Sequence, residues 1–344
     1  MAVNPENLTL IVGAGASGIL LARRLLERGV PALVLEKSRG VGGRVATRRI
    51  GTKKFDHGIS SLTQRQKESL QLFPSPKRSS NSEKDSAALF LPLPAPEKGY
   101  VSPLGLTAPM KALSHSLTIR LGFKVDQLSI SRGGKYWVLA DEQGNAVEGA
   151  RLVLTAPAPQ SYQLLEKSFP SQLTHLKEKL SKVIYQKQIV LLGIGDSKIA
   201  ESIRKSKEID RVIDNGVKGI HDSDQSLSVY ASPSFSEKYL DEPDEAILQK
   251  IEQSLNKIGP VDLSQFQVKR WRYSVPVNFI NEPYLPGNLN PELFCIGDYF
   301  TPGNLDGAIH SANELANYFQ HQITQKKDFS KKTGSLKHFG YFRR

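Results

Sequence analysis

Residues 8–29 read LTLIVGAGASGILLARRLLERG and residues 32–36 read ALVLE, and these two stretches decide the fold. The apolar run of residues 8–12 predicts a buried parallel strand. Apolar side chains then recur at helical spacing over residues 19–26, and a second apolar run follows. The order strand, helix, strand predicts a βαβ unit, around which the rest of the chain is arranged.

Three glycines lie between the first strand and the helix in the pattern G-x-G-x-x-G. Gly13 allows a tight turn, Gly15 a close approach of a pyrophosphate, and Gly18 close packing of helix on strand. Glu36, eighteen residues past Gly18, ends the second strand, where it can accept hydrogen bonds from ribose hydroxyls. The unit therefore predicts a dinucleotide site at the helix N-terminus.

The length and composition of the chain limit the classes of protein to which it can belong. A chain of 344 residues with 39% apolar content can form two domains or one large domain with an insertion. No apolar run reaches the ~20 residues of a membrane span, and no signal peptide is recognisable at the N-terminus, so we expect a cytoplasmic protein without a membrane partner. Cys295, the only cysteine, rules out intrachain disulfides and Cys-based metal sites, and no metal site is expected.

The net charge of +12 invites a nucleic-acid interpretation, but its distribution argues against one. Residues 321–344 hold seven Lys or Arg and one Asp, a net charge of +6, which is half of the net charge of the whole chain. We expect this weakly periodic tail to fray as a solvated segment, with contact to acidic surfaces as a lesser alternative. No nucleic-acid partner is expected.

Two turns follow the second strand. The glycine-rich residues 37–44 end in Arg44, which can pair with a diphosphate, although a surface loop with an incidental Arg is the alternative. In Asp56-His57-Gly58, the glycine allows close backbone approach to a ring, and His57 or Asp56 could point at that ring. A lone His or Asp in a turn is more often structural.

After residue 63 the chain first becomes polar in composition and then returns to patterns typical of helices and strands. Residues 64–98 are rich in Ser, Pro and charge and predict a long mobile excursion, either a lid or a tolerated surface loop. An amphipathic helix (104–117) and strands at 124–130, 135–140 and 151–155 follow, with Val125 near the adenine side of a cofactor.

Residues 158–286 predict an α+β module inserted between two halves of the nucleotide domain. Its strand Val268-Lys-Arg-Trp-Arg-Tyr273 alternates cations and aromatics. Trp271 and Tyr273 could wall a planar substrate while Arg270 or Arg272 binds a phosphate. The alternative is a half-buried edge strand with surface arginines.

A strand ends at Gly297-Asp298, and after a Pro/Gly turn a helix begins near Leu305-Asp-Gly-Ala308. Asp298 could hydrogen-bond a ribityl hydroxyl, and the helix N-terminus could face the electron-accepting ring edge of a flavin. This second anion-binding helix start favours FAD over NAD as the resident cofactor.

Taken together, the sequence motifs of this chain resemble those of the FAD-dependent flavin amine oxidase superfamily, and within it those of the renalase-like flavoproteins. The resemblance covers most of residues 8–320. The motifs that carry the resemblance are Gly13-Ala-Gly-Ala-Ser-Gly18, Gly42-Gly-Arg44, Asp56-His-Gly58, Val153-Leu-Thr-Ala-Pro157, Ile213-Asp-Asn215, Trp271-Arg272, Gly297-Asp298 and Asn304-Leu-Asp-Gly-Ala-Ile-His-Ser-Ala312. The glycine motifs are widely shared, whereas Trp271-Arg272 and Asn304-Leu-Asp-Gly307 point to the renalase-like group. Residues 64–98 and the basic tail lie outside the resemblance.

The resemblance implies a Rossmann-like FAD-binding domain of the glutathione-reductase/p-hydroxybenzoate-hydroxylase type with an inserted α+β substrate domain. It implies noncovalent FAD held by Gly13, Ala14, Gly15, Ser17, Gly18, Glu36, Lys37, Arg44, His57, Gly58, Val125, Asp298, Leu305 and Ala308. Asn215, Trp271 and Arg272 would border the substrate. The implied reaction is oxidation of 2- or 6-dihydro isomers of NAD(P)H, with hydride passing to FAD and O₂ accepting the electrons to give NAD(P)⁺ and H₂O₂.

The predicted division of the chain is a discontinuous FAD-binding domain (1–63, 100–157 and 287–322), the excursion (64–99), the substrate domain (158–286) and the basic tail (323–344). Two alternative functions remain open: an amine or polyene oxidoreductase on the same scaffold, and an FAD-binding interaction module without turnover. No acid-base dyad is recognisable, so no catalytic residue is assigned, which is consistent with hydride transfer by positioning. The sequence leaves the oligomeric state open.

Overall fold

The computed structural model describes residues 4–71, 90–94, 98–256 and 262–336. Its main sheet has the order β16-β17-β11-β1-β2-β7 and is parallel except for β16. These strands are β16 (Leu285–Pro286), β17 (Glu292–Cys295), β11 (Arg151–Leu154), β1 (Thr9–Val12), β2 (Ala32–Glu36) and β7 (Ile119–Leu121). The parallel sheet confirms the Rossmann-like fold class predicted from the sequence.

The βαβ unit has the predicted order. Helix α1 (Ala16–Glu27) connects β1 to β2, and the two strands pair in parallel with Thr9 opposite Ala32. Gly29 ends the connection at φ +68°, a left-handed conformation that favours glycine after a helix. Both strands are nearly continuous apolar runs because a parallel sheet is covered on both faces.

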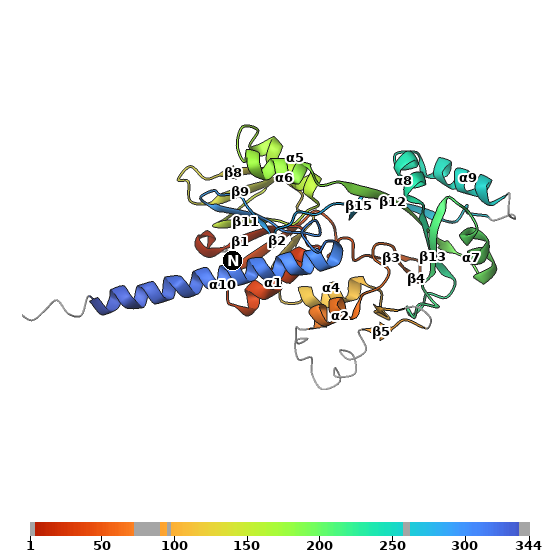
Figure 1. Ribbon diagram of the computed structural model, residues 1–344, viewed down its shortest axis with the longest axis horizontal. Helices are drawn as coiled ribbons and strands as arrows, with labels where there is room; N and C mark the ends of the chain where they lie inside the picture. The colour runs from red at the N-terminus through yellow and green to blue at the C-terminus, as the bar shows by residue number, and fades with distance from the viewer. Residues whose placement is uncertain (1–3, 72–89, 95–97, 257–261, 337–344) are drawn as a thin grey trace, which may run out of the picture.

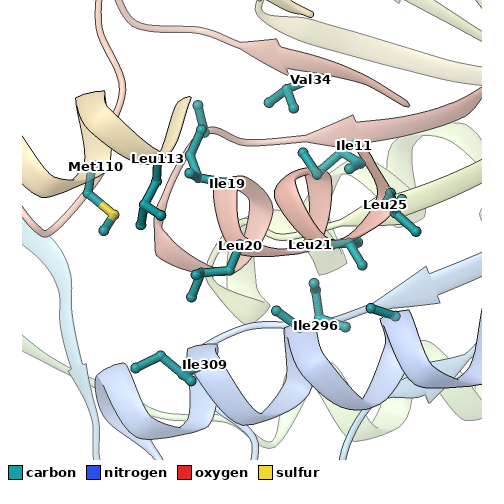
Figure 2. Packing of buried hydrophobic residues seen from close by; sticks show 14 of the residues in the cluster. Ile11, Ile19, Leu20, Leu21, Leu25, Val34, Met110, Leu113, Ile296 and Ile309 are labelled. Carbon is teal, nitrogen blue, oxygen red and sulfur yellow. The ribbon is translucent and has the colours of Figure 1, made fainter. Parts of the chain in front are cut away.

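One face of the main sheet is covered by α1 and by α10 (Asn304–Leu336), which run beside each other (Figure 1). Ile11 and Val34 of the sheet lie on one side of α1, and Leu20 of α1 points to the other side, toward α10 and Ile309 (Figure 2). Met110 and Leu113 of α4 (Thr107–Ser114) close the end of this core.

The opposite face is covered by a three-stranded antiparallel meander of β8 (Val125–Ile130), β9 (Trp137–Asp141) and β10 (Ala146–Gly149), together with α5 (Ala158–Ser168) and α6 (Thr174–Ser181). Leu165 and Leu180 of these helices share a buried cluster with Leu10 and Leu152 of the main sheet. Although α5 and α6 fall within the predicted insertion, their apolar faces therefore pack on the nucleotide-binding domain.

A second domain is built on the antiparallel sheet β13-β14-β12-β15. Its elements are β12 (Tyr185–Ile194), α7 (Ser197–Arg204), β13 (Ile209–Asp214), β14 (Ser226–Ala231), α8 (Pro233–Tyr239), α9 (Asp244–Leu255) and β15 (Gln267–Pro276). Ile189 and Leu191 of β12 and Val268 of β15 face the helices and form a separate core with them. Figure 1 shows this domain beside the main sheet, joined to it by the long strands β12 and β15.

A hairpin of β3 (Thr47–Ile50) and β4 (Lys53–Asp56) connects the two domains. Phe55 of the hairpin is buried against Val190, Leu192 and Tyr230 on the sheet face turned away from the helices. This apolar contact fixes the second domain against the loop that follows β4.

Residues 64–98 contain more structure than predicted. Helix α2 (Gln64–Gln71) begins the segment, and Gln66 Nε2 donates to Asp306 Oδ2 at 2.8 Å. Phe90 is buried in the core of α1 and α10, after which β5 (Leu91–Pro92) pairs with β6 (Tyr100–Val101). Tertiary contacts thus hold both ends of a stretch with a polar composition; the rest of the predicted excursion, 72–89 and 95–97, lies outside the described residues.

The predicted fraying after residue 320 is wrong for most of the tail, because α10 continues as a helix to Leu336. A helix that already has many turns adds each further residue at little cost, so weak periodicity does not end it. Residues 337–344 lie outside the described residues. A short 3₁₀ turn, η1 (Pro5–Asn7), precedes β1. In the described part of the chain, no helix is long and apolar enough to cross a membrane.

Candidate functional site

The three glycines of the first turn face different surroundings. Gly13 has φ +111°, and a Cβ there would lie 2.6 Å from Thr155 Oγ1. A Cβ on Gly18 would lie 2.0 Å from the carbonyl oxygen of Gly13, so this glycine is needed for the fold itself. A Cβ on Gly15 would meet nothing within 4 Å. Of these three glycines, Gly15 is therefore the one that borders open space, as we expect of a glycine next to a bound ligand.

Gly15 is also the N-cap of α1 and provides no side chain to cap the helix amides. The loop before Arg44 lies against it, because Gly42 N donates to Ala14 O at 2.8 Å. Gly43 is at φ +56°, and a Cβ there would be 3.2 Å from Gly15 Cα. Two glycine-rich turns thus meet at an uncapped helix N-terminus, which favours an anion. Ala14 and the buried Ser17 lie in this first turn.

Glu36 lies at the carboxyl end of β2, as predicted. Its Oε2 accepts from Ala14 N and its Oε1 from Ser38 N, both at 2.7 Å. These two bonds fix the carboxylate at the edge of the glycine turn and leave further lone pairs on its oxygens. Phe123 N donates to Glu36 O at 2.9 Å, so Val125, two residues on, starts β8 on the same side, and Lys37 is exposed next to Glu36.

Arg44 and Asp298, each assigned to a cofactor on separate grounds, are brought together by the fold. Arg44 Nη1 lies 2.5 Å from Asp298 Oδ2, and Tyr185 Oη donates to Asp298 Oδ1 at 2.8 Å. Burial and the adjacent Asp298 raise the pKa of Tyr185, which keeps its hydroxyl a donor. The three side chains come from three distant segments and form one polar cluster at the junction of the domains.

The helix start predicted near Leu305 follows this cluster. Gly307, in the first turn of α10, packs so closely that a Cβ would lie 2.2 Å from Phe300 O. The side chains of Leu305 and Ala308 are buried, and Leu305 belongs to the core of α1 and α10. Any contact of these two residues with a ligand would therefore involve their backbone.

His57 and Trp271, 214 residues apart, stack on each other with ring centroids 5.2 Å apart and planes at 22°. Trp271 Nε1 donates to His57 O at 2.8 Å, which anchors β15 to the turn after β4. His57 Nδ1 is buried and has no hydrogen-bond partner among the described residues. His57, which was expected to hold the cofactor, and Trp271, which was expected to border the substrate, are thus direct neighbours.

The pKa of His57 is lowered from 6.5 to about 4, chiefly by burial; Asp56 opposes this shift, and the nearby Lys269 and Arg48 contribute to it. The imidazole is therefore neutral near pH 7. Because the unfolded chain binds this proton more tightly, stability from His57 is full above pH 6.5 and falls as the pH drops toward 4. Between about pH 7 and pH 4, we expect wild type to lose about 3 kcal/mol more than His57→Gln, measured by urea unfolding. Equal losses in the two proteins would contradict the lowered pKa.

The backbone of Arg44 approaches Gly58 closely. A Cβ on Gly58 would lie 1.8 Å from Arg44 O, so this contact by itself already requires glycine. The predicted approach of Gly58 to a flavin ring stays a prediction.

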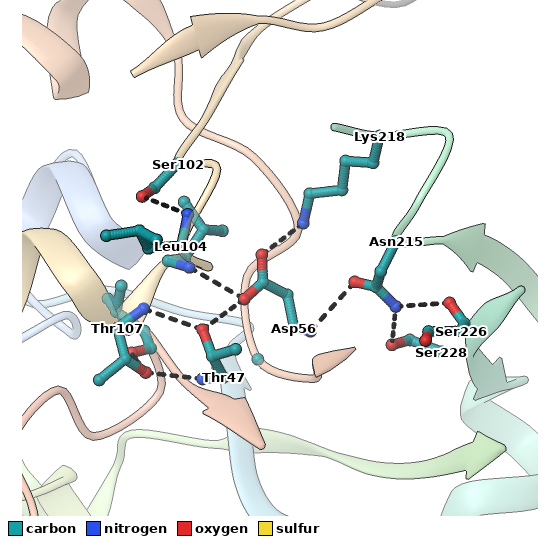
Figure 3. Close-up of polar contacts among 12 residues, drawn as sticks. Thr47, Asp56, Ser102, Leu104, Thr107, Asn215, Lys218, Ser226 and Ser228 are labelled. Atoms are coloured by element: carbon teal, nitrogen blue, oxygen red, sulfur yellow. Dashed lines mark hydrogen bonds and ion pairs between the residues drawn. The ribbon is translucent and has the colours of Figure 1, made fainter. Parts of the chain in front are cut away.

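Asn215 was predicted to border the substrate, and the structure places it elsewhere. It is fully buried; its Oδ1 accepts from Asp56 N at 3.0 Å, and its Nδ2 donates to Ser226 O and Ser228 Oγ, both at 2.9 Å. Figure 3 shows Asn215 joining the hairpin to β14. With its amide used in these bonds, Asn215 positions the domains and does not face a substrate.

Asp56 lies in the same network and is also structural. Its carboxylate accepts from Lys218 Nζ at 2.6 Å and from Thr47 Oγ1 at 2.5 Å (Figure 3). It also accepts from Leu106 N at 2.9 Å. The exposed fraction of the Asp56 side chain is 0% and that of Lys218 is 4%. This buried ion pair connects β4 to the loop after β13.

The phosphate role predicted for Arg270 or Arg272 is also corrected. Arg270 Nε donates to Leu240 O at 2.7 Å and Arg270 Nη1 pairs with Asp244 at 2.5 Å, while the exposed Arg272 pairs with Asp241. Both are therefore turned toward the segment of α8 and α9. Alternation along β15 places Lys269 and Trp271 on the opposite face, toward the hairpin. Tyr273 follows a register shift, and its ring packs edge-on against Tyr185.

Sequence reasoning missed three side chains that the fold brings to this region: Tyr185, Lys269 and Arg48. Lys269 could have been found, because it lies two residues before Trp271 and hence on the same face of the strand. Arg48 and Tyr185 give no comparable signal, since only the packing of the hairpin and of β12 brings them here.

Together, the fold and the site define a two-domain protein with a Rossmann-like dinucleotide-binding domain. Residues 11–73 match the family described as the NAD(P)-binding Rossmann-like domain.

Solved structures with the same fold cover nearly the whole chain. A proposed protoporphyrinogen oxidase from Exiguobacterium sp. 255-15 is 14% identical with a TM-score of 0.67, over 92% of this chain and 99% of that one. Cyclohexylamine oxidase from Brevibacterium oxydans IH-35A is 14% identical with a TM-score of 0.61, over 93% and 100%. A fatty acid isomerase from P. acnes is 13% identical with a TM-score of 0.62, over 92% and 100%. Enzymes with such different names share the architecture, so the reaction must be argued from the site.

Proposed function

We propose that this protein is an FAD-dependent oxidoreductase that holds its cofactor noncovalently. The observation that carries the proposal is a continuous line of contacts. It runs from Glu36 through the open turn at Gly15 and the Gly42-Gly43 loop to Arg44, and on through Gly58 to the stack of His57 on Trp271. An acid for the ribose, an anion site for the diphosphate and an aromatic wall for a planar ring follow in the order in which a dinucleotide presents those groups.

The residues present fit FAD by two independent features. The position that a Gly15 Cβ would fill is open at the helix N-terminus, and the buried Nδ1 of His57 has no partner among the described residues. Cys295 is fully buried and burial raises the pKa of its thiol, so it is neither accessible nor nucleophilic enough for a covalent flavin link. We therefore propose that FAD is bound noncovalently, as the resemblance implied.

FAD is preferred to NAD as the resident cofactor because of the second polar cluster. Asp298, held by Arg44 and Tyr185, provides carboxylate lone pairs for ribityl hydroxyls, and the α10 N-terminus follows it. A nicotinamide dinucleotide has no ribityl chain and does not need this cluster. The interaction of Arg44 with Asp298 also keeps both side chains oriented before a ligand arrives.

When bound, FAD would supply a two-electron acceptor for hydride that O₂ can reoxidise. The protein's own contribution is to orient the substrate and exclude water. The neutral His57 and Trp271 form a flat wall. No proton shuttle is required from these residues, because hydride transfer depends chiefly on stacking and distance.

For the substrate, we propose the 2- and 6-dihydro isomers of NAD(P)H, in line with the renalase-like resemblance, with NAD(P)⁺ and H₂O₂ as products. The amine-oxidase alternative is supported by the name of the cyclohexylamine oxidase with the same fold. The cations near Trp271 disfavour a protonated amine and favour a substrate that bears phosphate.

The test is anaerobic stopped-flow of the FAD-loaded protein with 6-dihydro-NAD, following the flavin absorption near ~450 nm. We expect rapid bleaching that air reverses, and much slower or no bleaching with cyclohexylamine at the same concentration. Bleaching by amines alone would move the proposal to amine oxidation. A protein that binds FAD but accepts hydride from neither donor class would favour the noncatalytic module, and one that binds no FAD would contradict the proposal altogether.

A further inference from the structure

We propose that Arg48 and Lys269 form an anion-binding subsite beside the stack of His57 on Trp271, and that it takes the phosphate groups of the substrate. The inference rests on the proposed function for the identity of the substrate. It assigns the anion contact to Arg48 of the hairpin and to Lys269 on the hairpin-facing side of β15, in place of Arg270 and Arg272.

The orientation of Lys269 follows from strand pairing. Lys269 is directly opposite Val190 in the β12–β15 pair, and Trp271 is opposite Gln188. Side chains opposite each other in an antiparallel pair lie on the same face of the sheet. Because Val190 packs against Phe55 of the hairpin, Lys269 is also on the face toward the hairpin. Lys269 and Trp271 are two residues apart on this face and hence neighbours along it.

The orientation of Arg48 follows from the hairpin in the same way. Arg48 is directly opposite Phe55 in the β3–β4 pair. Since Phe55 is buried against Val190, its cross-strand neighbour Arg48 is on the side of the hairpin that faces the second domain. Ile50, two residues along β3, packs on the same cluster. Arg48 and Lys269 therefore approach each other from two domains across the contact of Phe55 with Val190.

In the described part of the chain, the two cations of this pair lack a direct carboxylate partner. Among the described residues, neither Arg48 nor Lys269 has a carboxylate within ion-pair distance. The nearby acids have other partners: Asp56 pairs with Lys218 and Asp244 with Arg270. Burial and then Arg48 lower the pKa of Lys269, with Asp244 opposing them, and both cations act on the pKa of His57, as their positions around the stack require.

Arg48 and Lys269 lie next to the flat aromatic surface of His57 and Trp271. This arrangement favours a ligand in which an anionic group is attached to a planar ring. Arg provides a planar fork of donors for phosphate oxygens and Lys a compact charge. A cationic amine would be repelled by the same pair. The ligand class that fits is thus a phosphate-bearing planar molecule whose ring lies against Trp271.

The test compares Arg48→Gln, Lys269→Gln and the double variant with wild type, all FAD-loaded, in two measurements. The first is calorimetric titration with inorganic diphosphate. We expect each single change to weaken binding about tenfold, the loss of one charge-assisted contact, and the double change to weaken it more. The second is KM for 6-dihydro-NAD against KM for the corresponding dihydronicotinamide riboside, which has no phosphate. KM should rise about tenfold for the dinucleotide only.

Arg272→Gln is the matched control, since Arg272 is an exposed cation on the same strand but on the other face. It should leave both measurements unchanged. Equal diphosphate binding by wild type and the double variant would overturn the subsite, even in an enzyme that oxidises the dinucleotide. Diphosphate binding that depends on Arg48 and Lys269 in a protein without turnover would preserve the subsite and contradict the proposed function. Weakening by Arg272→Gln to the same degree would reduce the effect to net charge and overturn the assignment.

Discussion

Replacing Asp56 by Ala is expected to lower the free energy of unfolding by about 3–5 kcal/mol, because it leaves a buried ammonium without its carboxylate. The carboxylate of Asp56 is fully buried and lies 2.6 Å from Lys218 Nζ. The change also removes the acceptor for Leu106 N and Thr47 Oγ1, which are in the same buried network. Urea unfolding followed by tryptophan fluorescence measures the loss.

Asp126→Ala is the matched control, since Asp126 pairs with Lys167 at 2.7 Å but the two side chains are 34% and 56% exposed. Its cost should stay below about 1 kcal/mol. Adding Lys218→Met to Asp56→Ala should recover part of the lost stability by removing the second charge. If Asp56→Ala costs no more than Asp126→Ala, the pair does not hold the domains together.

Replacing Gly15 by Ala is expected to weaken FAD binding by about tenfold to a hundredfold while leaving the protein folded. The added Cβ would meet no protein atom within 4 Å, and Gly15 has φ −75° and ψ −174°, which any residue adopts. The methyl group would instead occupy the space in which a diphosphate reaches the helix amides. Titration of the apoprotein with FAD, followed by flavin fluorescence, gives the change in affinity.

Gly18→Ala is expected to lower stability, whereas Gly15→Ala is expected to weaken FAD binding. The two variants therefore distinguish an effect on folding from an effect on cofactor binding. Its Cβ would lie 2.0 Å from the Gly13 carbonyl oxygen, so the helix must shift from the strand, and we expect a loss of stability of about 1–3 kcal/mol or more. Gly15→Ala should change stability by no more than about 1 kcal/mol, as at other N-cap positions. Unchanged FAD affinity in Gly15→Ala would show that no diphosphate lies at this turn.

The two experiments probe different parts of one arrangement. The Asp56 network sets where the second domain lies, and through Phe55 and Asn215 it also sets the position of β15. The glycine turn provides the anion site at the other end. A weakened Asp56 variant that still binds FAD would therefore separate cofactor binding from formation of the wall at Trp271.

The nucleotide-binding half of the site could be predicted from local patterns of residues. The strand, the glycine turn, the helix and Glu36 lie within 29 consecutive residues, 8–36, so their interactions are local and their periodicity is visible in the sequence. The buried Cys295 in an apolar strand and the start of α10 after Asp298 could be predicted for the same reason. The extent of α10 could not, because helix propagation does not depend on an apolar face.

The other half of the site depends on contacts between distant segments and could not be predicted in this way. Alternation along β15 separates Trp271 from Arg270 and Arg272, but which face meets the hairpin depends on where α8 and α9 pack. Asn215 is structural because Asp56, 159 positions away, donates its backbone amide to it. The stack of His57 on Trp271 and the pairing of Arg44 with Asp298 likewise join residues more than 200 positions apart. Such contacts depend on the packing of whole domains, which no local pattern of residues encodes.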